Sequence, residues 1–482
     1  MNTTISEVGK ITTGNTPPKK DPKNYGNDYP WVKPGDLDKD IPVTETEESL
    51  SEKGASLARL LPTNTVLVSC IGNLGKIGIA GTQLATNQQI NSISFEEAIV
   101  YPKYGYYYCK TLKKWLEDNS SATTIPIINK TRFSEAPFYL PPLSEQHRIV
   151  SAIEALFARL DATNEKLDIA LGILKKFRES VLAAAFNGRL TGDWRVAFQN
   201  SKVESESFDK HINVNSISSS ENPITGNNEV FPALPNKWCW ATIEHLASNK
   251  PRSIQSGPFG SNLLHSEFQK TGILAIGIDN VLYRSFSLGK EHRISNDKYQ
   301  ELIKYTARPL DVLITVMATV GRCCVVPQNI ETAIITKHVY RITPNIEVIS
   351  PYYLMNALSG AAIVKEQIDN QIRGQTRPGI NGKILKETSI PLPPLPEQQE
   401  IVRRVDALFA FADSIEAKVA AAREKTEKLR QSILAKAFSG QLVETEAEIA
   451  RREGGDYETA TVLLERIKTE KKIGKKNNSA AF

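Results

Sequence analysis

The sequence predicts an α+β fold in which two globular domains are separated by two long antiparallel helices, with a pseudo-two-fold internal repeat. Three observations predict this architecture. One segment of the chain occurs twice, each copy has the apolar spacing of a single long helix, and the remaining stretches are rich in short β-like runs. A chain of 482 residues can bury cores in about three folding units.

The repeated segment begins with a proline-containing motif. The run LPPLSEQ at 140–146 returns as LPPLPEQ at 392–398, and the register then holds without a gap at an offset of 252 residues. A weaker match upstream aligns TVLVS at 65–69 with DVLIT at 311–315. The chain is therefore predicted to repeat the order domain, helix, domain, helix.

Each copy reads as one long helix. Ser144 can cap the first copy, Pro396 suits the first turn of the second, and Gly188 and Gly440 stand where a C-terminal stop belongs. The first copy carries a one-sided apolar stripe formed by Ile149, Ile153, Leu156, Leu160, Leu167, Leu171, Leu174 and Val181. A helix of this length reaches about 60 Å. We predict that the two copies pack on each other as an antiparallel coiled-coil rod; a helix lying on its own domain is the alternative.

The predicted segments follow from these helices and from a Ser/Asn/Glu-rich linker with few apolar residues. They are a first globular domain at 1–140, a first helix at 141–198, the linker at 199–230, a second globular domain at 231–391, a second helix at 392–446, and a C-terminal segment at 447–482 that we expect to dock a partner.

Composition narrows the class of protein. No window approaches the ~20 uninterrupted apolar residues that a membrane span needs, and the start of the chain has no apolar signal-peptide core. Five cysteines without C-x-x-C spacing indicate a reduced cytoplasm and no structural zinc. The net charge of +5 is uneven: residues 1–140 hold 15 basic and 15 acidic side chains, and residues 231–391 hold 18 and 12. This distribution argues against a polycation that coats nucleic acid along its whole length.

Polar clusters suited to nucleic acid occur at matched places in the two globular domains. Asn87-Gln88-Gln89 can contact adenine edges through amides, and Thr336-Lys337-His338 offers donors for guanine. Glycine-containing turns before Lys76 and Arg322 bring a cation to a hairpin tip, which is what phosphate contact requires. Solvated surface loops are the alternative for each cluster taken alone.

Catalytic signatures are absent from the sequence. It contains no phosphate-binding P-loop, no H-E-x-x-H zinc motif and no Asn-Pro-Pro-aromatic motif of amino-methyltransferases. Asp36 with Glu52 and Lys53 only faintly resembles the carboxylate-lysine set of a nuclease. We therefore expect no catalytic residue and no metal site in this chain.

The doubled motif L-P-P-L-x-E-Q-x-x-I-V closely resembles that of specificity subunits of type I restriction-modification systems. Further likenesses are KFR at 176–178, AAFNGRLT at 184–191, LPNKW at 234–238 and LLERI at 463–467. The resemblance covers essentially the whole chain. One departure is that the first domain lacks the Leu-Pro-x-x-Trp opening of the second. Two explanations stay open: a shorter first strand in this domain, or a true start of the protein upstream of Met1.

The resemblance implies that each globular domain is a target-recognition domain that reads one half of a bipartite, asymmetric site in double-stranded DNA. The two helices would set the spacer between the half-sites and dock two modification subunits, which carry S-adenosylmethionine and the methylation chemistry. Two restriction subunits, which use ATP and Mg, would join them. The chain itself would bind no cofactor, hold no membrane contact and work in the cytoplasm.

Repeat position and side-chain chemistry then suggest the DNA contacts. In the first domain these are Lys19, Lys20, Asn73, Lys76, Asn87, Gln88, Gln89, Lys130 and Arg132. In the second domain they are Arg252, Arg322, Lys337, His338, Arg373, Gln375 and Arg377. Two other functions stay open on the residues alone: a self-contained DNA methyltransferase or nuclease with unrecognised motifs, and a coiled-coil scaffold for protein interactions.

Overall fold

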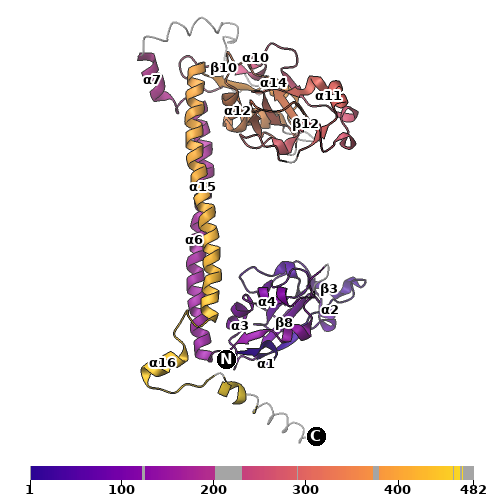
Figure 1. Ribbon diagram of the computed structural model, residues 1–482, viewed down its shortest axis with the longest axis vertical. Helices are drawn as coiled ribbons and strands as arrows, with labels where there is room; N and C mark the ends of the chain where they lie inside the picture. The colour runs from indigo at the N-terminus through magenta and orange to yellow at the C-terminus, as the bar shows by residue number, and fades with distance from the viewer. Residues whose placement is uncertain are drawn as a thin grey trace. The chain divides into compact units, whose positions relative to one another are not determined.

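The computed structural model describes residues 2–121, 125–200, 231–289, 291–317, 319–372, 379–459, 461–466 and 469. The chain divides into two compact units: unit 1 comprises residues 1–167 and 421–482, and unit 2 comprises residues 168–420. Each unit contains one globular head and part of each long helix, α6 (Leu143–Phe186) and α15 (Leu395–Phe438) (Figure 1). We call residues 2–140 head 1 and residues 231–391 head 2.

Head 1 is built on a four-stranded antiparallel sheet with the strand order β2-β8-β5-β6. Its strands are β2 (Gly9–Thr13), β5 (Val66–Ser69), β6 (Ile77–Ile79) and β8 (Ile90–Phe95). A smaller sheet, β4-β3-β7, consists of β3 (Tyr25–Val32), β4 (Ser49–Leu50) and β7 (Ala85–Thr86). The remaining elements are β1 (Asn2–Thr4) paired with β9 (Pro137–Tyr139), and the helices α1 (Ile5–Val8), α2 (Glu52–Leu57), α3 (Pro102–Cys109), α4 (Lys113–Asp118) and α5 (Lys130–Ser134).

Head 2 has a matching sheet with the order β11-β18-β15-β16. Its strands are β11 (Ile254–Ser256), β15 (Val312–Thr315), β16 (Cys323–Val325) and β18 (Val339–Ile342). A second sheet consists of β12 (Ile273–Ile276), β13 (Arg293–Ile294), β14 (Thr306–Ala307) and β17 (Ala333–Ile335). The remaining elements are β10 (Cys239–Thr242) paired with β19 (Ser389–Leu392), and the helices α10 (Ile243–Leu246), α11 (Asn296–Leu302), α12 (Pro351–Gly360), α13 (Ala362–Ile372) and α14 (Gly382–Glu387).

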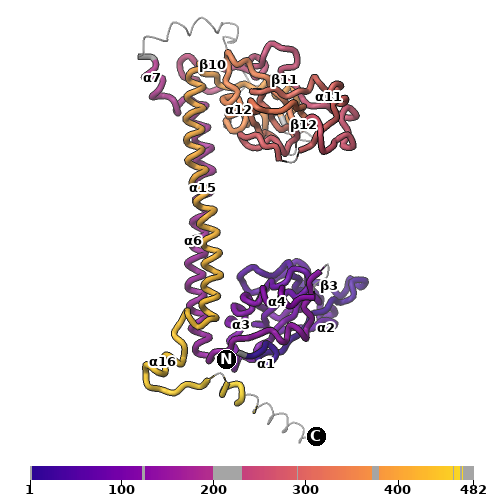
Figure 2. Tube along the Cα trace, viewed as in Figure 1, coloured from indigo at the N-terminus to yellow at the C-terminus, as the bar shows by residue number. Residues whose placement is uncertain are grey.

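The two heads share one topology; Figure 2 traces the chain through each of them. Strand order in the main sheet is the same, and each smaller sheet contains one parallel pair, β3 with β7 in head 1 and β12 with β17 in head 2. Each head also has its first and last strands paired to each other. The predicted α+β repeat is confirmed. None of the helices in the described ranges is long and apolar enough to cross a membrane.

The two long helices pack antiparallel within each unit. In unit 1, Asp161 of α6 pairs with Arg430 of α15. Asn164, three residues later in α6, accepts a 2.9 Å hydrogen bond at its Oδ1 from Thr426, which lies four residues before Arg430 in α15. The two helices therefore run in opposite directions. In unit 2, Arg178 binds the neighbouring carboxylates of α15. Arg178 and Arg430 occupy the same position of the sequence repeat, so one interhelical ion pair is made twice.

Each head shares its core with both helices of its unit. Ile149, Ile153 and Phe157 of α6 join Leu434 of α15 in the core of head 1, and the same pattern with α6 and α15 exchanged occurs in head 2. The predicted packing of the two helices on each other and the alternative packing of a helix on its own domain therefore both occur, because one face of each helix contacts the partner helix and the head. Half of the predicted stripe is buried, namely Ile149, Ile153, Leu174 and Val181, while Leu156, Leu160, Leu167 and Leu171 are only partly buried. Phe157, which the predicted stripe left out, is buried beside Leu156.

The glutamine of the repeated motif holds the head to the start of each helix. Gln146 Nε2 donates to the carbonyls of Ile99 and Pro141 at 2.9 and 3.0 Å, and its Oε1 accepts from a head backbone N–H at 2.8 Å. Gln398 makes the corresponding three bonds in unit 2, each within 2.8–2.9 Å. Both side chains are fully buried. The side chain thereby satisfies backbone groups that the turn into the helix would otherwise leave unpaired.

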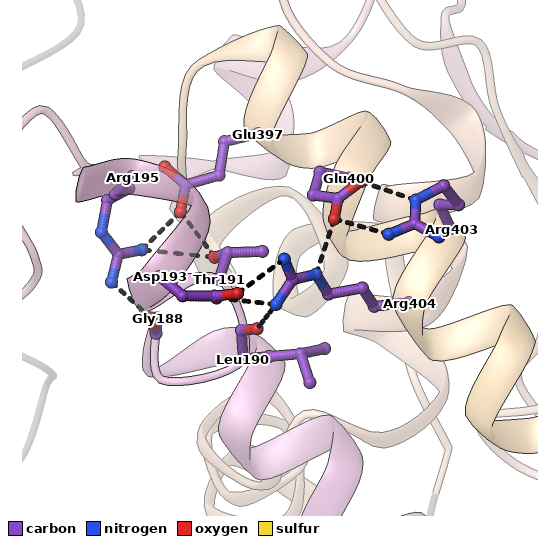
Figure 3. Close-up of polar contacts among 9 residues, drawn as sticks. All are labelled: Gly188, Leu190, Thr191, Asp193, Arg195, Glu397, Glu400, Arg403 and Arg404. Carbon is purple, nitrogen blue, oxygen red and sulfur yellow. Dashed lines mark hydrogen bonds and ion pairs between the residues drawn. The ribbon is translucent and has the colours of Figure 1, made fainter. Parts of the chain in front are cut away.

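The glutamate beside Gln398 organises the other side of the helix start. Glu397, 2% exposed, accepts a hydrogen bond from Thr191 Oγ1 at 2.6 Å and pairs with Arg195 (Figure 3). It also accepts a hydrogen bond from Trp238 Nε1 at 2.9 Å. Thr191 and Arg195 belong to the turn and helix α7 (Gly192–Asn200) that follow α6. A buried carboxylate with three donors is fully compensated, which burial of a charge requires.

About two helical turns beyond Glu397 in α15, Arg404 completes this junction. It donates to the Leu190 carbonyl at 2.8 Å and to Asp193 Oδ1 at 2.7 Å, and it shares Glu400 with Arg403 (Figure 3). Hydrogen bonds from Arg403 and Arg404 lower the pKa of Glu400 to about 2. The end of α6 is thus tied by charge to the start of α15.

Unit 1 closes the equivalent junction with the chain that follows α15. Glu145 Oε2 accepts the backbone N–H of Glu446 at 2.9 Å, at the start of α16 (Glu446–Glu453), and Arg148 pairs with the Glu446 carboxylate. Farther on, Leu463 and Leu464 are buried in the core of head 1. Head 1 lacks the Leu-Pro-x-x-Trp opening that head 2 has. In unit 1, residues after α15 bind Glu145 in its place.

Replacing Gln398 with leucine is expected to lower the free energy of unfolding of unit 2 by about 2–4 kcal/mol, because three buried backbone partners lose their hydrogen bonds. Urea unfolding of the full chain checks this. Gln399 is exposed and adjacent in sequence, so Gln399→Leu is the matched control, expected to stay within about 0.5 kcal/mol of the parent. Equal effects of the two variants would contradict the assigned role.

Candidate nucleic-acid interface

In both heads the turn after the first strand of the main sheet contains a glycine. Because glycine has no β-carbon, this turn can pack directly against the backbone of a second loop. A β-carbon on Gly14, which follows β2, would lie 2.2 Å from the Asn87 carbonyl oxygen. A β-carbon on Gly257, which follows β11, would lie 2.3 Å from the Thr336 carbonyl oxygen. No larger residue fits at such distances from backbone. The loops 86–89 and 336–338 are therefore held in equivalent places, as the repeat predicted.

The polar side chains of the head 1 loop differ in availability. Asn87 is buried, and both ends of its amide bond Gln89: Nδ2 donates to Oε1 at 2.8 Å, and Oδ1 accepts from the backbone N–H at 3.0 Å. Gln88 is exposed, and its Oε1 accepts a hydrogen bond from Thr16 Oγ1. In this arrangement Asn87 shapes the loop, whereas Gln88 presents its amide nitrogen to solvent.

The hairpin tips place one cation on each head by the same device. The Oγ of Ser69 accepts from the Lys76 backbone N–H at 2.9 Å, and the Oγ1 of Thr315 accepts from the Arg322 backbone N–H at 3.1 Å. The residue before each cation is a glycine with a positive φ, 74° in head 1 and 88° in head 2. This turn needs glycine, so the tips hold Lys76 and Arg322 at matching positions.

Backbone hydrogen bonds join these loops into one edge in each head. The Cys70 N–H, just after β5, donates to the Gln89 carbonyl at 2.8 Å, and its carbonyl accepts from the Ile128 N–H at 2.8 Å. Val316 makes the same two bonds in head 2, at 3.0 and 3.2 Å, to the corresponding residues. The segment before α5 or α14, the hairpin tip and the loop after β7 or β17 therefore lie together.

The predicted contact residues are mostly exposed, with some exceptions. Exposed side chains are those of Lys19, Lys20, Asn73, Gln88, Lys130, Arg132, Arg252, Arg322 and Lys337. Lys76, Gln89 and His338 are partly buried, and Asn87 is buried. Arg373, Gln375 and Arg377 lie outside the described residues.

The two cations of α5 have different surroundings. Arg132 donates to Glu135 at 2.7 Å, also binds the Asn119 side chain, and lies 5.8 Å from the centre of the Trp115 ring. Lys130, on the same helix, is exposed, and no bond of its side chain to another described residue is found. Arg132 is thus committed to contacts within head 1, while Lys130 is available to a ligand.

The surroundings of His338 favour the neutral form of its imidazole. Burial lowers the pKa of its imidazole, and the adjacent Lys337 lowers it further. Its Nδ1 is buried without a hydrogen-bond partner among the described residues. A neutral imidazole can donate or accept, so this side chain suits a polar ligand better than a phosphate.

Two residues at these edges escaped the sequence analysis. Lys113 lies against the hairpin tip, because a β-carbon on Gly75 would be 3.0 Å from its Cγ. Phe259, in the turn after β11, is 55% exposed. The adjacent lysines Lys113 and Lys114 could have indicated Lys113 as a candidate contact from the sequence. Exposure of a phenylalanine in a loop has no signal in a single sequence.

The faint nuclease-like set does not assemble. Asp36 is buried and accepts the Lys33 backbone N–H at 2.9 Å, while Lys53 binds Asp21 at 2.6 Å. Burial raises the pKa of the Cys70 thiol to about 12, so this thiol is not activated as a nucleophile. Within the described ranges no group of three or more His, Cys, Asp or Glu side chains could hold a metal ion.

Comparison with known proteins identifies the family. The family model described as the type I restriction modification DNA specificity domain matches residues 1–171 and 280–422. The chain is 30% identical to the EcoBI specificity subunit of a type I restriction enzyme from Escherichia coli, over 82% of this chain and 78% of that one. It is 31% identical to the EcoDI specificity subunit, also from Escherichia coli, over 78% of each chain.

A solved structure shows the same fold. It comes from work on complex assembly and conformational transition of the type I R-M system, and it matches with a TM-score of 0.63 and 20% identity over 92% of this chain and 98% of that one. The repeated topology, the paired long helices and the family match agree, and the chain belongs to the family of type I restriction-modification DNA specificity proteins.

Proposed function

We propose that this chain is the DNA sequence-specificity subunit of a type I restriction-modification complex. Each head reads one half of a bipartite, asymmetric DNA site, and the long helices fix the spacer and dock the modification subunits. The observation that carries this proposal is the matched loop edge of the two heads. The same backbone frame presents different side chains, Gln88 and Lys76 in head 1 and Lys337 and Arg322 in head 2. A common frame with diverged side chains suits two readers of different sequences.

The charge of head 1 supports the proposal that partner subunits contribute to DNA binding. Residues 1–140 hold 15 basic and 15 acidic side chains, so head 1 supplies few net phosphate contacts, on which DNA affinity largely depends. We propose that two modification subunits provide the remaining contacts to the DNA and that two restriction subunits join the complex in the cytoplasm. S-adenosylmethionine belongs in this proposal to the modification subunits, and ATP and Mg to the restriction subunits; this chain is a non-catalytic recognition subunit.

Mapping of methylated bases tests the proposal. The chain is co-expressed with its modification subunits in a host that lacks other methylation, and methylated positions are read across the genome. A single bipartite motif with a fixed spacer is the expected result. Methyl transfer by the purified chain alone would instead establish the self-contained methyltransferase, and absence of any DNA dependence in the complex would favour the protein scaffold.

Arg322→Ala is expected to weaken DNA binding by the complex about five- to tenfold and to reduce the slope of log affinity against log salt by about 0.9, as loss of one phosphate contact requires. Titration of labelled DNA at several salt concentrations measures both. Lys298 is the control in the same head, because it is bound to Glu267 and Glu301; Lys298→Ala should leave the slope unchanged. An unaltered slope in Arg322→Ala would remove this residue from the interface.

The isolated chain is expected to bind its site far more weakly than the complex does at physiological salt, because head 1 is electrically neutral overall. Comparing the dissociation constants of chain and complex on the mapped site checks this. Equal affinities would show that the two heads suffice and that partners add no grip.

A further inference from the structure

Arg284 links three parts of unit 2. Its Nε donates to Asn356 Oδ1 in α12 at 2.6 Å, and its Nη2 donates to Asp406 Oδ1 in α15 at 2.5 Å. Its guanidinium carbon also lies 4.3 Å from the centre of the Phe409 ring in α15. A planar guanidinium that is bound in two directions and stacked on a ring has a defined orientation. We call this group, Arg284 with Asn356, Asp406 and Phe409, the Arg284 clamp.

The backbone of Arg284 is also held in place. The residue adopts φ 59°, a left-handed conformation that costs energy for a side chain other than glycine. Its N–H donates to the Cys323 carbonyl of β16 at 2.8 Å, and its side chain is only 12% exposed. The loop therefore reaches α15 from a strand of the main sheet, so the clamp joins the sheet of head 2 to the long helix.

Unit 1 uses the same loop with the opposite charge. Asp38 has φ 63°, and its N–H donates to the Ile77 carbonyl of β6 at 2.9 Å, as Arg284 does to β16. Two residues later, Asp40 lies 3.6 Å from Arg430 of α15 and also binds Lys110. Burial raises the pKa of the Asp40 carboxyl, but Lys110 and Arg430 outweigh it and the net pKa is lowered.

The ring beneath the guanidinium recurs as well. Arg430 lies 4.3 Å from the centre of the Phe157 ring, the same distance as Arg284 from Phe409. Phe157 and Phe409 are equivalent in the repeat. In unit 1 the arginine comes from the helix and the acid from the head, and the helix acid Glu154, equivalent to Asp406, binds Lys103 of the head at 2.7 Å. In unit 2 the arginine comes from the head and the acid from the helix. Two different solutions at one place indicate a requirement for a charged head-to-helix contact there.

We propose that Arg284, and Asp40 in unit 1, are positioning residues that fix the orientation of each head on its helices and so make the complex selective for spacer length. This inference rests on the proposed function. Adding one base pair moves a half-site by about 3.4 Å and turns it by about a tenth of a helical turn. A head that can pivot on its helix follows such a change, and a clamped head does not.

The test uses the complete complex and DNA that carries the mapped half-sites with the natural spacer or a spacer one base pair shorter or longer. Wild-type complex is expected to prefer the natural spacer. In Arg284→Ala that preference should fall about tenfold, the scale of one charged hydrogen bond. Preference for the correct bases within the head 2 half-site should stay within about twofold of wild type.

Two further variants separate positioning from loss of folding. Asp406→Ala removes the clamp from the helix side and leaves the interior of head 2 intact, so it should relax spacer preference to the same extent as Arg284→Ala, with no further effect in the double variant. Arg293→Ala is the matched control, because Arg293 binds Glu291 and Glu331 within head 2 only; spacer preference should be unchanged.

The outcomes are distinguishable. Unchanged spacer preference in Asp406→Ala overturns the inference, and so does a uniform loss of binding to all spacers in that variant, which would indicate a structural role alone. A wild-type complex that binds no bipartite site at all would instead overturn the proposed function and leave the clamp a feature of folding.

Discussion

The structure depends on the buried Glu-Gln pair at the start of each long helix. A helix that begins inside a domain leaves backbone donors and acceptors in a dry environment. Gln146 and Gln398 satisfy the carbonyl and N–H groups of the head that meet the helix there. Glu145 and Glu397 bind the segment that follows the other long helix. Each pair therefore fixes three chain segments at one point, which explains why this dipeptide recurs unchanged in the repeat.

The helix pair is a repeated element that supports two heads with different side chains. Arg178 and Arg430, Asp161 and Asp413, and Phe157 and Phe409 hold equivalent places. The main sheets also share one topology, yet the loops at the candidate interface carry different residues in the two heads. The two heads thus differ in the side chains of the candidate interface, while both share their cores with the long helices.

Much of this architecture could be predicted from the sequence because duplication and helical spacing are local signals. The long helices, their glycine stops and the antiparallel pairing followed from residues such as Gly188 and Gly440, whose positive φ values of 78° and 76° agree with that reading. The candidate site was harder. Asn87 has the chemistry of a base reader, but burial and its bonds to Gln89 come from packing that no motif records. Arg284 gave no signal, because its partners lie 72 and 122 residues away in the chain.

The clamps have a consequence for how such a chain can change over time. Both helix surfaces offer one phenylalanine, one arginine and one acid at equivalent places: Phe157, Arg430 and Glu154 in unit 1, and Phe409, Arg178 and Asp406 in unit 2. Head 1 binds the arginine through Asp40 and the acid through Lys103, and head 2 binds the acid and the ring through Arg284. The two helices therefore present equivalent sets of side chains that can bind a head residue of either charge. A different head on the same helices would need apolar residues that complete the shared core and a charged loop that reaches this set of side chains, while the helices themselves could stay the same.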